Sequence, residues 1–298
     1  MKSPAISRSL CLFVFLAALP AAVQAADTDN SSTNLAVRTV NGYLMVVRVS
    51  INGQGPFDFL VDTGTNTTLV DPSLAADLKL KPVDRMALAT LADATPVVRY
   101  YADTLQAGQA SVAHLEVLGA PLNEIRALDS RIRGVMGMNF LLQFSFLLDY
   151  RHRRMAIFPF PDSAPVPAGR RVNVQINDSR ILIPVASQSS PAGAWNLVLD
   201  SGIGSVLLFQ SRVRSIAGPC VAAPCMMQVA TNGLNYAAPA VVIPEMVIAE
   251  RALINESAIV LRNDLLKTTD PQDGLLPASL FRSVFFDRSN ATLVVESR

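Results

Sequence analysis

The feature that most constrains this chain is an aspartate-hydroxyl-glycine triplet that occurs twice, each time at the end of an apolar segment. Residues 62–64 (DTG) end the segment FDFLV, and residues 200–202 (DSG) end the segment WNLVL, 138 positions later. Asp, Thr, Ser and Gly all favour turns, so one triplet alone would be compatible with a surface turn. Two copies with the same apolar lead-in favour a shared structural role.

The similarity between the two halves extends well beyond the triplets. Further segments align at the same offset of 138 residues, and each half also contains a glycine followed by two apolar residues. The segments at this offset are YLMVV at 43–47 with ILIPV at 181–185 and FLLD at 146–149 with VFFD at 284–287; the glycine segments are GVM at 134–136 and GLL at 274–276. The sequence therefore predicts an internal duplication that gives two lobes.

This paired pattern resembles the bilobal aspartic proteases of the pepsin and retropepsin-like superfamily, in an exported bacterial-type form. The resemblance covers essentially the whole chain after its leader. It implies an all-β fold of two barrel-like lobes with short helices, related by a pseudo-twofold axis. It also implies an aspartic endopeptidase in which Asp62 and Asp200 form a catalytic dyad, where one carboxyl accepts a proton from water while the other donates one.

The resemblance assigns supporting roles to the residues that follow each aspartate. Thr63 and Ser201 would hydrogen-bond across to the opposite lobe. Gly64 and Gly202 would allow the two loops to approach closely, because a β-carbon would intrude there. Thr65 occupies a position where the family usually has a small or hydroxyl residue.

The second half departs from the family pattern at two positions. Ile203 stands where the first half has Thr65, and Pro277, which lacks a backbone N–H, stands where the first half has Gly137. Thr65 can hydrogen-bond near its carboxylate and favour the ionised form, whereas Ile203 offers only hydrocarbon, which favours a protonated Asp200. We therefore expect the shared proton on Asp200.

The departures leave a second function open, a catalytically silent peptide-binding protein of the same fold. A third arrangement uses Asp62 alone, with two chains pairing across it. The duplicated second lobe makes this third arrangement unnecessary, and the sequence predicts a monomer that acts on a peptide or protein substrate.

The N-terminus has the pattern of a secretory signal peptide. Lys2 and Arg8 precede an apolar run at residues 10–19, and VQA ends at Ala25, where we expect cleavage. The run is about half of the ~20 residues that a membrane-spanning helix needs. We expect an exported protein, periplasmic or secreted, without a membrane anchor after cleavage.

The remaining sequence divides into segments by composition. Half of the residues are hydrophobic, which is enough for a core in each lobe. We expect a signal peptide at 1–25, a flexible polar leader at 26–36, a first lobe at 37–157, a proline-rich linker at 158–171 and a second lobe at 172–298.

Three local elements are predicted near the first triplet. Residues 43–61 form a hairpin, Asp71 caps a short helix at 73–80, and residues 86–106 form a second hairpin. The second hairpin could supply a flap over the substrate, as could a hairpin in the second lobe at Asn232-Gly233. The sequence does not decide between them.

Other chemistries have little support in the composition. Loss of Lys2 and Arg8 with the signal peptide changes the formal net charge from +1 to −1, which does not favour binding to nucleic acid. The chain has only two histidines, His114 and His152, and no cluster of His, Cys and carboxylate residues at ligand spacing. We predict no metal and no cofactor.

Two cysteines, Cys220 and Cys225, follow the predicted signal peptide. A cysteine pair in an exported protein is typical of a disulfide. A redox site would favour two intervening residues, and this pair has four. We therefore predict a structural disulfide.

Overall fold

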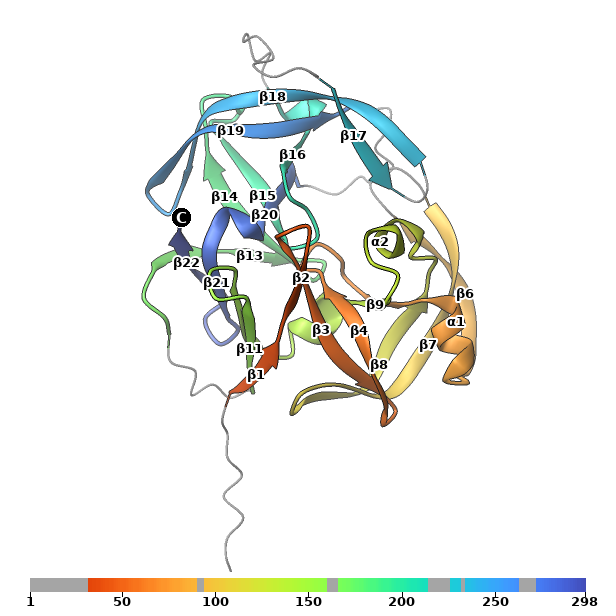
Figure 1. Ribbon diagram of the computed structural model, residues 1–298. Helices are drawn as coiled ribbons and strands as arrows, with labels where there is room; N and C mark the ends of the chain where they lie inside the picture. The colour runs from red at the N-terminus through yellow and green to blue at the C-terminus, as the bar shows by residue number, and fades with distance from the viewer. Residues whose placement is uncertain (1–31, 90–93, 160–165, 214–225, 232–233, 263–271) are drawn as a thin grey trace, which may run out of the picture.

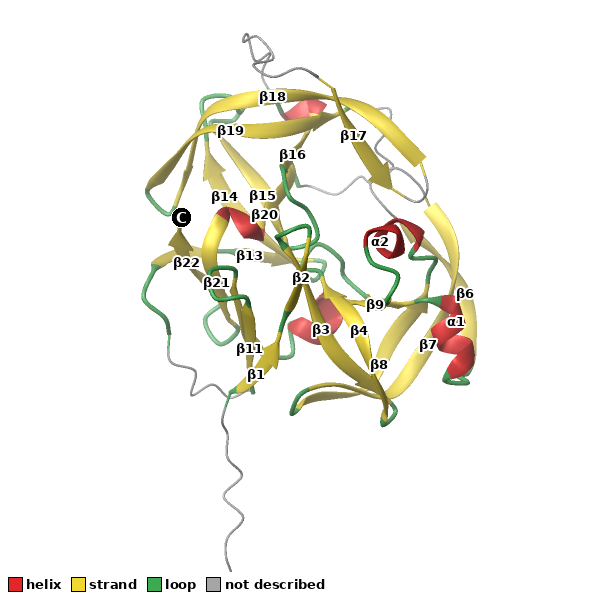
Figure 2. Cartoon of the chain, in the orientation of Figure 1, coloured by secondary structure: helices red, strands yellow, loops and turns green. Residues whose placement is uncertain are grey.

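The computed structural model describes residues 32–89, 94–159, 166–213, 226–231, 234–262 and 272–298. Strands dominate the described part of the chain, and the few helices are short (Figure 2). The predicted signal peptide, Cys220 and Cys225 lie outside the described residues. None of the described helices is long and apolar enough to cross a membrane.

The first lobe is built on an eight-stranded sheet with the order β2-β3-β4-β9-β5-β8-β7-β6, at the lower right of Figure 1. Its helices are α1 (Pro72–Asp77), α2 (Asn123–Leu128) and α3 (Met138–Leu141). Its strands are β2 (Arg38–Val40), β3 (Leu44–Ile51), β4 (Gln54–Val61), β5 (Thr68–Val70), β6 (Pro82–Ala89), β7 (Ala94–Ala107), β8 (Ala110–Gly119) and β9 (Ile132–Met136).

The second lobe has an eight-stranded sheet with the order β13-β14-β15-β20-β16-β19-β18-β17, which lies at the top of Figure 1. Its strands are β13 (Gln175–Asn177), β14 (Arg180–Ala186), β15 (Ala194–Asp200), β16 (Val206–Phe209), β17 (Met226–Thr231), β18 (Leu234–Ile248), β19 (Arg251–Leu261) and β20 (Gly274–Pro277), with the 3-10 helices η1 (Gln210–Arg212) and η3 (Ala278–Leu280). Each strand has a counterpart at the same place in the first sheet. The predicted all-β, bilobal duplication is confirmed.

A third sheet of six strands joins the two lobes, and each half of the chain supplies three of its strands. Its order is β1 (Thr33–Ala36), β11 (Arg154–Phe158), β10 (Ser145–Asp149), β21 (Phe281–Asp287), β22 (Thr292–Ser297) and β12 (Arg170–Asn173). At its centre β10 pairs antiparallel with β21, and Leu147 lies opposite Phe285. These two residues are 138 positions apart, so the pseudo-twofold axis passes between the two strands.

The core is continuous across all three sheets. One cluster of buried apolar side chains includes Phe59 of the first lobe, Trp195 of the second, and Phe146 and Phe286 of the joining sheet. The last two rings lie with their centroids 5.4 Å apart. This spacing is within the range of favourable aromatic pairs, and it ties the two halves together at the axis.

Three boundaries differ from the sequence predictions. Residues 33–36, predicted as part of the flexible leader, form β1 and pair with β11, because their inward-facing residues are buried while the intervening ones are exposed. Strand β12 begins at Arg170, inside the predicted linker at 158–171. Helix α1 ends at Asp77, three residues before the predicted end at Leu80, because Lys79 has a φ of +54°.

The predicted hairpins are present. Strands β3 and β4 meet at Asn52-Gly53, where both residues have positive φ, as a type I′ turn requires. Strands β6 and β7 form the second hairpin, and its tip at 90–93 lies outside the described residues. Asn232-Gly233 also lies outside them, so the choice of flap stays a prediction.

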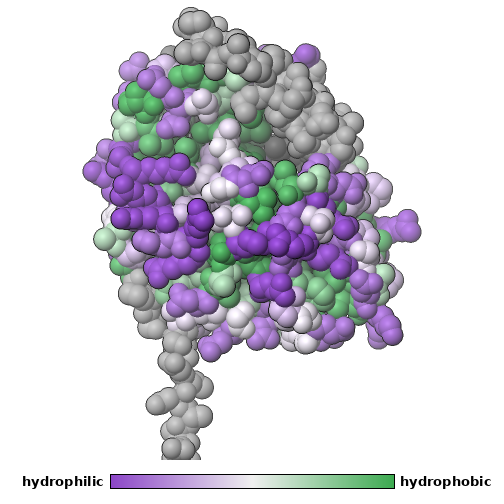
Figure 3. All heavy atoms as spheres, viewed as in Figure 1, coloured by the Kyte–Doolittle hydropathy of each residue, from purple (hydrophilic) through white to green (hydrophobic). Residues whose placement is uncertain are grey.

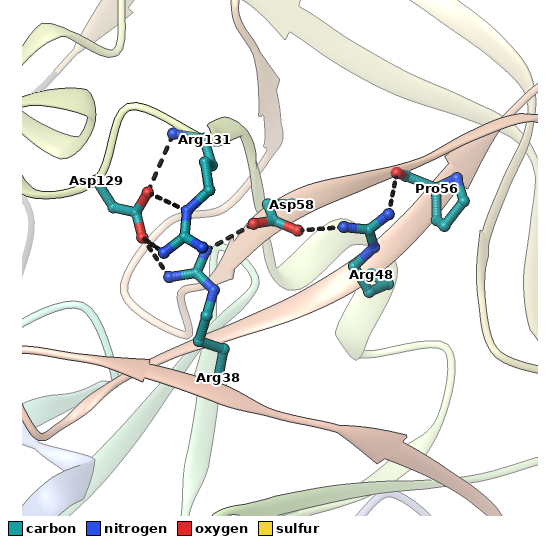
Figure 4. Close-up of polar contacts among 6 residues, drawn as sticks. All are labelled: Arg38, Arg48, Pro56, Asp58, Asp129 and Arg131. Atoms are coloured by element: carbon teal, nitrogen blue, oxygen red, sulfur yellow. Dashed lines mark hydrogen bonds and ion pairs between the residues drawn. The ribbon is translucent and has the colours of Figure 1, made fainter.

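A network of arginines and carboxylates fixes the strand that leads into the first triplet (Figure 4). Asp58 on β4 is buried and accepts hydrogen bonds from Arg38 at 2.6 Å and from Arg48 at 3.0 Å. Arg38 also pairs with Asp129, which accepts two bonds of 2.9 Å from Arg131. The bonds from Arg131 hold the pKa of Asp129 below its usual value. The network therefore joins β2, β3, β4 and the segment after α2.

Hydrophilic residues cover much of the molecular face in Figure 3, with smaller hydrophobic areas between them. This distribution matches a β-protein whose apolar side chains are mostly enclosed within and between its sheets.

Candidate active site

The two triplets lie at the ends of equivalent central strands. Strand β4 is parallel to β9, and β15 is parallel to β20. Asp62 directly follows β4, and its N–H donates to the carbonyl oxygen of Met136 at 3.1 Å. Asp200 is the last residue of β15 and lies opposite Pro277. Each aspartate is thus held by strands of its own lobe.

The hydroxyl residues of the two triplets bond across the lobes. The Thr63 hydroxyl accepts from the Ser201 N–H at 3.0 Å and donates to the carbonyl of Leu199 at 2.8 Å. The Ser201 hydroxyl accepts from the Thr63 N–H at 3.0 Å and donates to the carbonyl of Val61 at 2.8 Å. Both side chains are buried, so these four bonds satisfy groups that water does not reach. The arrangement has the cross-lobe form that the family resemblance implies.

The triplet glycines are required by close approach. A β-carbon on Gly64 would lie 2.3 Å from Oδ2 of Asp200, and one on Gly202 would lie 3.0 Å from the carboxyl of Asp62. Each carboxyl therefore lies against the glycine of the opposite loop. The Gly64 N–H also donates to Asp62 at 2.8 Å, and the Gly202 N–H donates to Asp200 at 2.7 Å.

The two carboxyls hydrogen-bond to each other and differ in proton affinity. Burial raises the pKa of Asp62, while the N–H groups of Gly64 and Thr65 and the bond to Asp200 lower it. Burial raises the pKa of Asp200 further, and the negative charge of Asp62 adds to the rise. Two carboxyls this close share one proton. The environment favours that proton on Asp200, with Asp62 as the acceptor.

The source of this asymmetry differs in part from the sequence expectation. The backbone N–H of Thr65 bonds to Asp62, whereas its hydroxyl donates to the carbonyl of Thr67 at 3.5 Å. The backbone N–H of Thr65, and not its hydroxyl, therefore lowers the pKa of Asp62. Ile203 packs against the second lobe's own apolar cluster, which includes Leu207.

The structure also accommodates the proline in the second lobe. In the first lobe the Gly137 N–H donates to the hydroxyl of Thr68 at 3.2 Å. Pro277 has no N–H to donate, and the counterpart of Thr68 is Val206, which has no hydroxyl to accept. The donor and the acceptor of this bond are thus both absent from the second lobe.

Sequence reasoning missed residues on two turns that reach the opposite lobe. Tyr43, in the turn between β2 and β3, lies where a β-carbon on Gly204 would be 2.8 Å from its ring. Burial, followed by the charge of Asp200, raises the pKa of Tyr43. Arg180, at the start of β14, donates through Nε to Asn66 at 2.8 Å. The sequence signal that could have identified Tyr43 and Arg180 is that the two repeats differ at these positions.

A third missed residue is Tyr150, which directly follows β10. Its hydroxyl is buried and has no hydrogen-bond partner in the described part of the chain. Burial raises the pKa of Tyr150, and the charges of Asp200 and Asp62 raise it further. Tyr150 is therefore a neutral phenol near the pair.

The histidines do not join this site. His114 stacks on Tyr101 with ring centroids 4.5 Å apart, and His152 lies 2.9 Å from a carboxylate oxygen of Asp149. Within the described residues, no group of three His, Cys, Asp or Glu side chains is placed to hold a metal ion.

Comparisons with known proteins support the two-lobed fold. The family model described as "Aspartyl protease" matches residues 47–140, which include the first triplet. A comparison with curated protein sequences finds no match. Among solved structures, the fold resembles the crystal structure of the aspartic proteinase from Irpex lacteus, with a TM-score of 0.53 and 12% identity over 90% of this chain and 97% of that chain. The chain therefore has the two-lobed fold of an aspartic proteinase, and its first lobe matches the aspartyl protease family model.

Proposed function

We propose that this protein is an aspartic endopeptidase that hydrolyses peptide bonds with water activated by Asp62 and Asp200. The observation that carries the proposal is the contact between the two carboxyls, each lying against the glycine of the opposite loop. The hydroxyls of Thr63 and Ser201 each accept one hydrogen bond and donate one across the lobes, and these bonds hold the two carboxyls in a fixed relative position.

The proton balance of the pair fits general acid and base catalysis. Ionised Asp62 takes a proton from water as the water oxygen bonds to the peptide carbonyl carbon. Protonated Asp200 gives its proton to the carbonyl oxygen, and a tetrahedral diol forms. Asp62 then protonates the leaving nitrogen, the C–N bond breaks, and a diol hydroxyl returns its proton to Asp200. Both carboxyls end in their starting states.

The second candidate is a catalytically silent peptide-binding protein. Ile203 and Pro277 favour it, since both depart from the family pattern beside Asp200. The endopeptidase has the stronger support because Ile203 packs on an apolar cluster and because Pro277, which has no N–H, occurs together with Val206, which has no hydroxyl, at the position of the first-lobe acceptor. Neither departure removes the Gly202 bond to the carboxyl of Asp200.

The proposal includes the expected form of the enzyme. It is exported after cleavage behind Ala25, to the periplasm or beyond, and works there as a monomer without a metal or cofactor. A disulfide joins Cys220 and Cys225. Its substrates are peptides or unfolded proteins, which two lobes can hold between them.

The direct test is cleavage of a denatured protein by purified residues 26–298 across a range of pH. Wild type is expected to cut it, while Asp62→Asn and Asp200→Asn lose nearly all turnover. Asp77→Asn is the matched control, because Asp77 lies on α1 in a surface ion pair with Arg133. Peptide binding by wild type without cleavage would establish the silent binder instead.

A further inference from the structure

Two hairpin turns reach from one lobe to the loop that follows the aspartate of the other. The turn between β2 and β3 places Tyr43 against Gly204 of the second lobe. The turn between β13 and β14 precedes Arg180, which bonds to Asn66 of the first lobe. The turns are equivalent in the duplication, but their contacts differ in charge.

Arg180 is held by partners from both lobes. Its Nε donates to Oδ1 of Asn66 at 2.8 Å, and its Nη1 donates to Oε1 of the buried Gln272 at 3.3 Å. The amide of Asn66 also donates to Asp178 at 2.7 Å. Asp178 and Ser179 both have positive φ, so a tight turn presents these side chains to the first lobe.

The equivalent positions in the other repeat cannot make this bridge. At the offset of 138 residues, Arg180 corresponds to Gly42 and Asn66 corresponds to Gly204. One side of the aspartate pair therefore carries a cationic bridge and the other an aromatic contact. The duplicated fold has become asymmetric at the point where its two aspartates differ.

We propose that Arg180 is a positioning residue of the aspartate pair, which locks the β13–β14 turn onto the first lobe's loop and keeps a fixed positive charge beside Asp200. This inference rests on the proposed endopeptidase for its effect on turnover. The position of the Arg180 charge beside Asp200 can be tested even if the protein cleaves no substrate.

The effect of Arg180 on the pKa of Asp200 has the direction expected of a nearby positive charge. The charge of Arg180 lowers the pKa of Asp200, against the larger effects of burial and of the Asp62 charge, which raise it. Among the described residues, Tyr43 and Tyr150 also interact with the pair, and their pKa values are raised, so both stay neutral in acid. Asp178 lies on the bridge itself and bonds to Asn66.

The charge of Arg180 affects the alkaline side of the pH profile of activity. A lower pKa of Asp200 means that the shared proton is lost at lower pH, so Arg180 limits activity on the alkaline side. Removing its charge is expected to keep the proton on the pair to higher pH. The upper limb of the pH profile then moves upward.

The test compares Arg180→Gln, which keeps an amide donor for Asn66 but no charge, with Arg180→Lys, which keeps the charge. Arg180→Met is a second neutral variant in case the first fails to fold. Arg133→Met is the control, since Arg133 pairs with Asp77 on α1. Two readouts are taken, kcat/KM against pH and an NMR titration of the aspartate carboxyl carbons.

We expect both neutral variants to move the upper limb and the Asp pair's titration to higher pH, with Arg180→Lys and Arg133→Met close to wild type. An unshifted neutral variant, or an Arg180→Lys that shifts as far as Arg180→Gln, would overturn the inference. If wild type cuts nothing while the NMR shift appears, the proposed function fails and the role of Arg180 stands.

Discussion

The cross-lobe hydroxyl bonds lead to a stability prediction that separates hydrogen bonding from packing. Thr63→Val keeps the shape of the side chain but removes its hydroxyl. The Ser201 N–H and the Leu199 carbonyl, both bonded to that hydroxyl, are then left buried without partners. Each unpaired buried group costs about 1–3 kcal/mol, so we expect a loss of about 2–6 kcal/mol in unfolding free energy.

The matched control is Thr63→Ser, which keeps the hydroxyl and removes one buried methyl group. A single methyl deletion in a core costs about 0.5–1.5 kcal/mol. Urea unfolding can be followed by circular dichroism and by Trp195, which is the chain's one tryptophan and is buried in the second lobe. The midpoint is expected to fall much further for Thr63→Val than for Thr63→Ser. Equal losses in the two variants would refute the assignment of the stability to these bonds.

Three further predictions concern the site and the exported form. Gly64→Ala is expected to reduce kcat more than Gly202→Ala, because its β-carbon would lie 2.3 Å from the opposite carboxyl against 3.0 Å, and equal kcat values would contradict this. Ile203→Thr is expected to lower the free energy of unfolding, because it would place a hydroxyl against the apolar cluster that includes Leu207; an unchanged free energy would contradict this. Thiol titration of exported, non-reduced protein is expected to find Cys220 and Cys225 oxidised, and free thiols would exclude their disulfide.

The duplication made much of the fold and the centre of the site predictable. A repeat at a constant offset places equivalent residues around a twofold axis, so Asp62 and Asp200 were expected to meet. The triplet hydroxyls and glycines followed from the family resemblance. The hairpin at Asn52-Gly53 was predictable because its turn chemistry is local.

The outer strands of the joining sheet are harder to predict from the sequence. The sequence predicts a flexible leader at residues 33–36 because this segment is short and partly polar, whereas its order as β1 depends on pairing with β11, more than 100 residues away. Strand β12 was missed for the same reason, since it pairs with β22 near the C-terminus. Short edge strands carry little signal of their own.

The residues that make the site asymmetric were also missed. Arg180 and Tyr43 lie on turns, where polar and aromatic residues are common and carry no obvious signal of function. Their importance comes from contact with the opposite lobe. Comparison of the two repeats identifies the differing positions, but only the three-dimensional arrangement places them beside the aspartates.

The central claim is that Asp62 and Asp200 act as one unit, and a double-mutant cycle on turnover tests it most directly. Asp62→Asn, Asp200→Asn and the double variant are compared for kcat on one peptide, after each is shown to fold. Each single variant is expected to lose about 10²–10⁴-fold or more in kcat, as for the loss of a general acid or base. Since neither carboxyl works alone, the double variant should fall no further. Independent, multiplying losses, or an Asp200→Asn variant with wild-type kcat, would contradict the account.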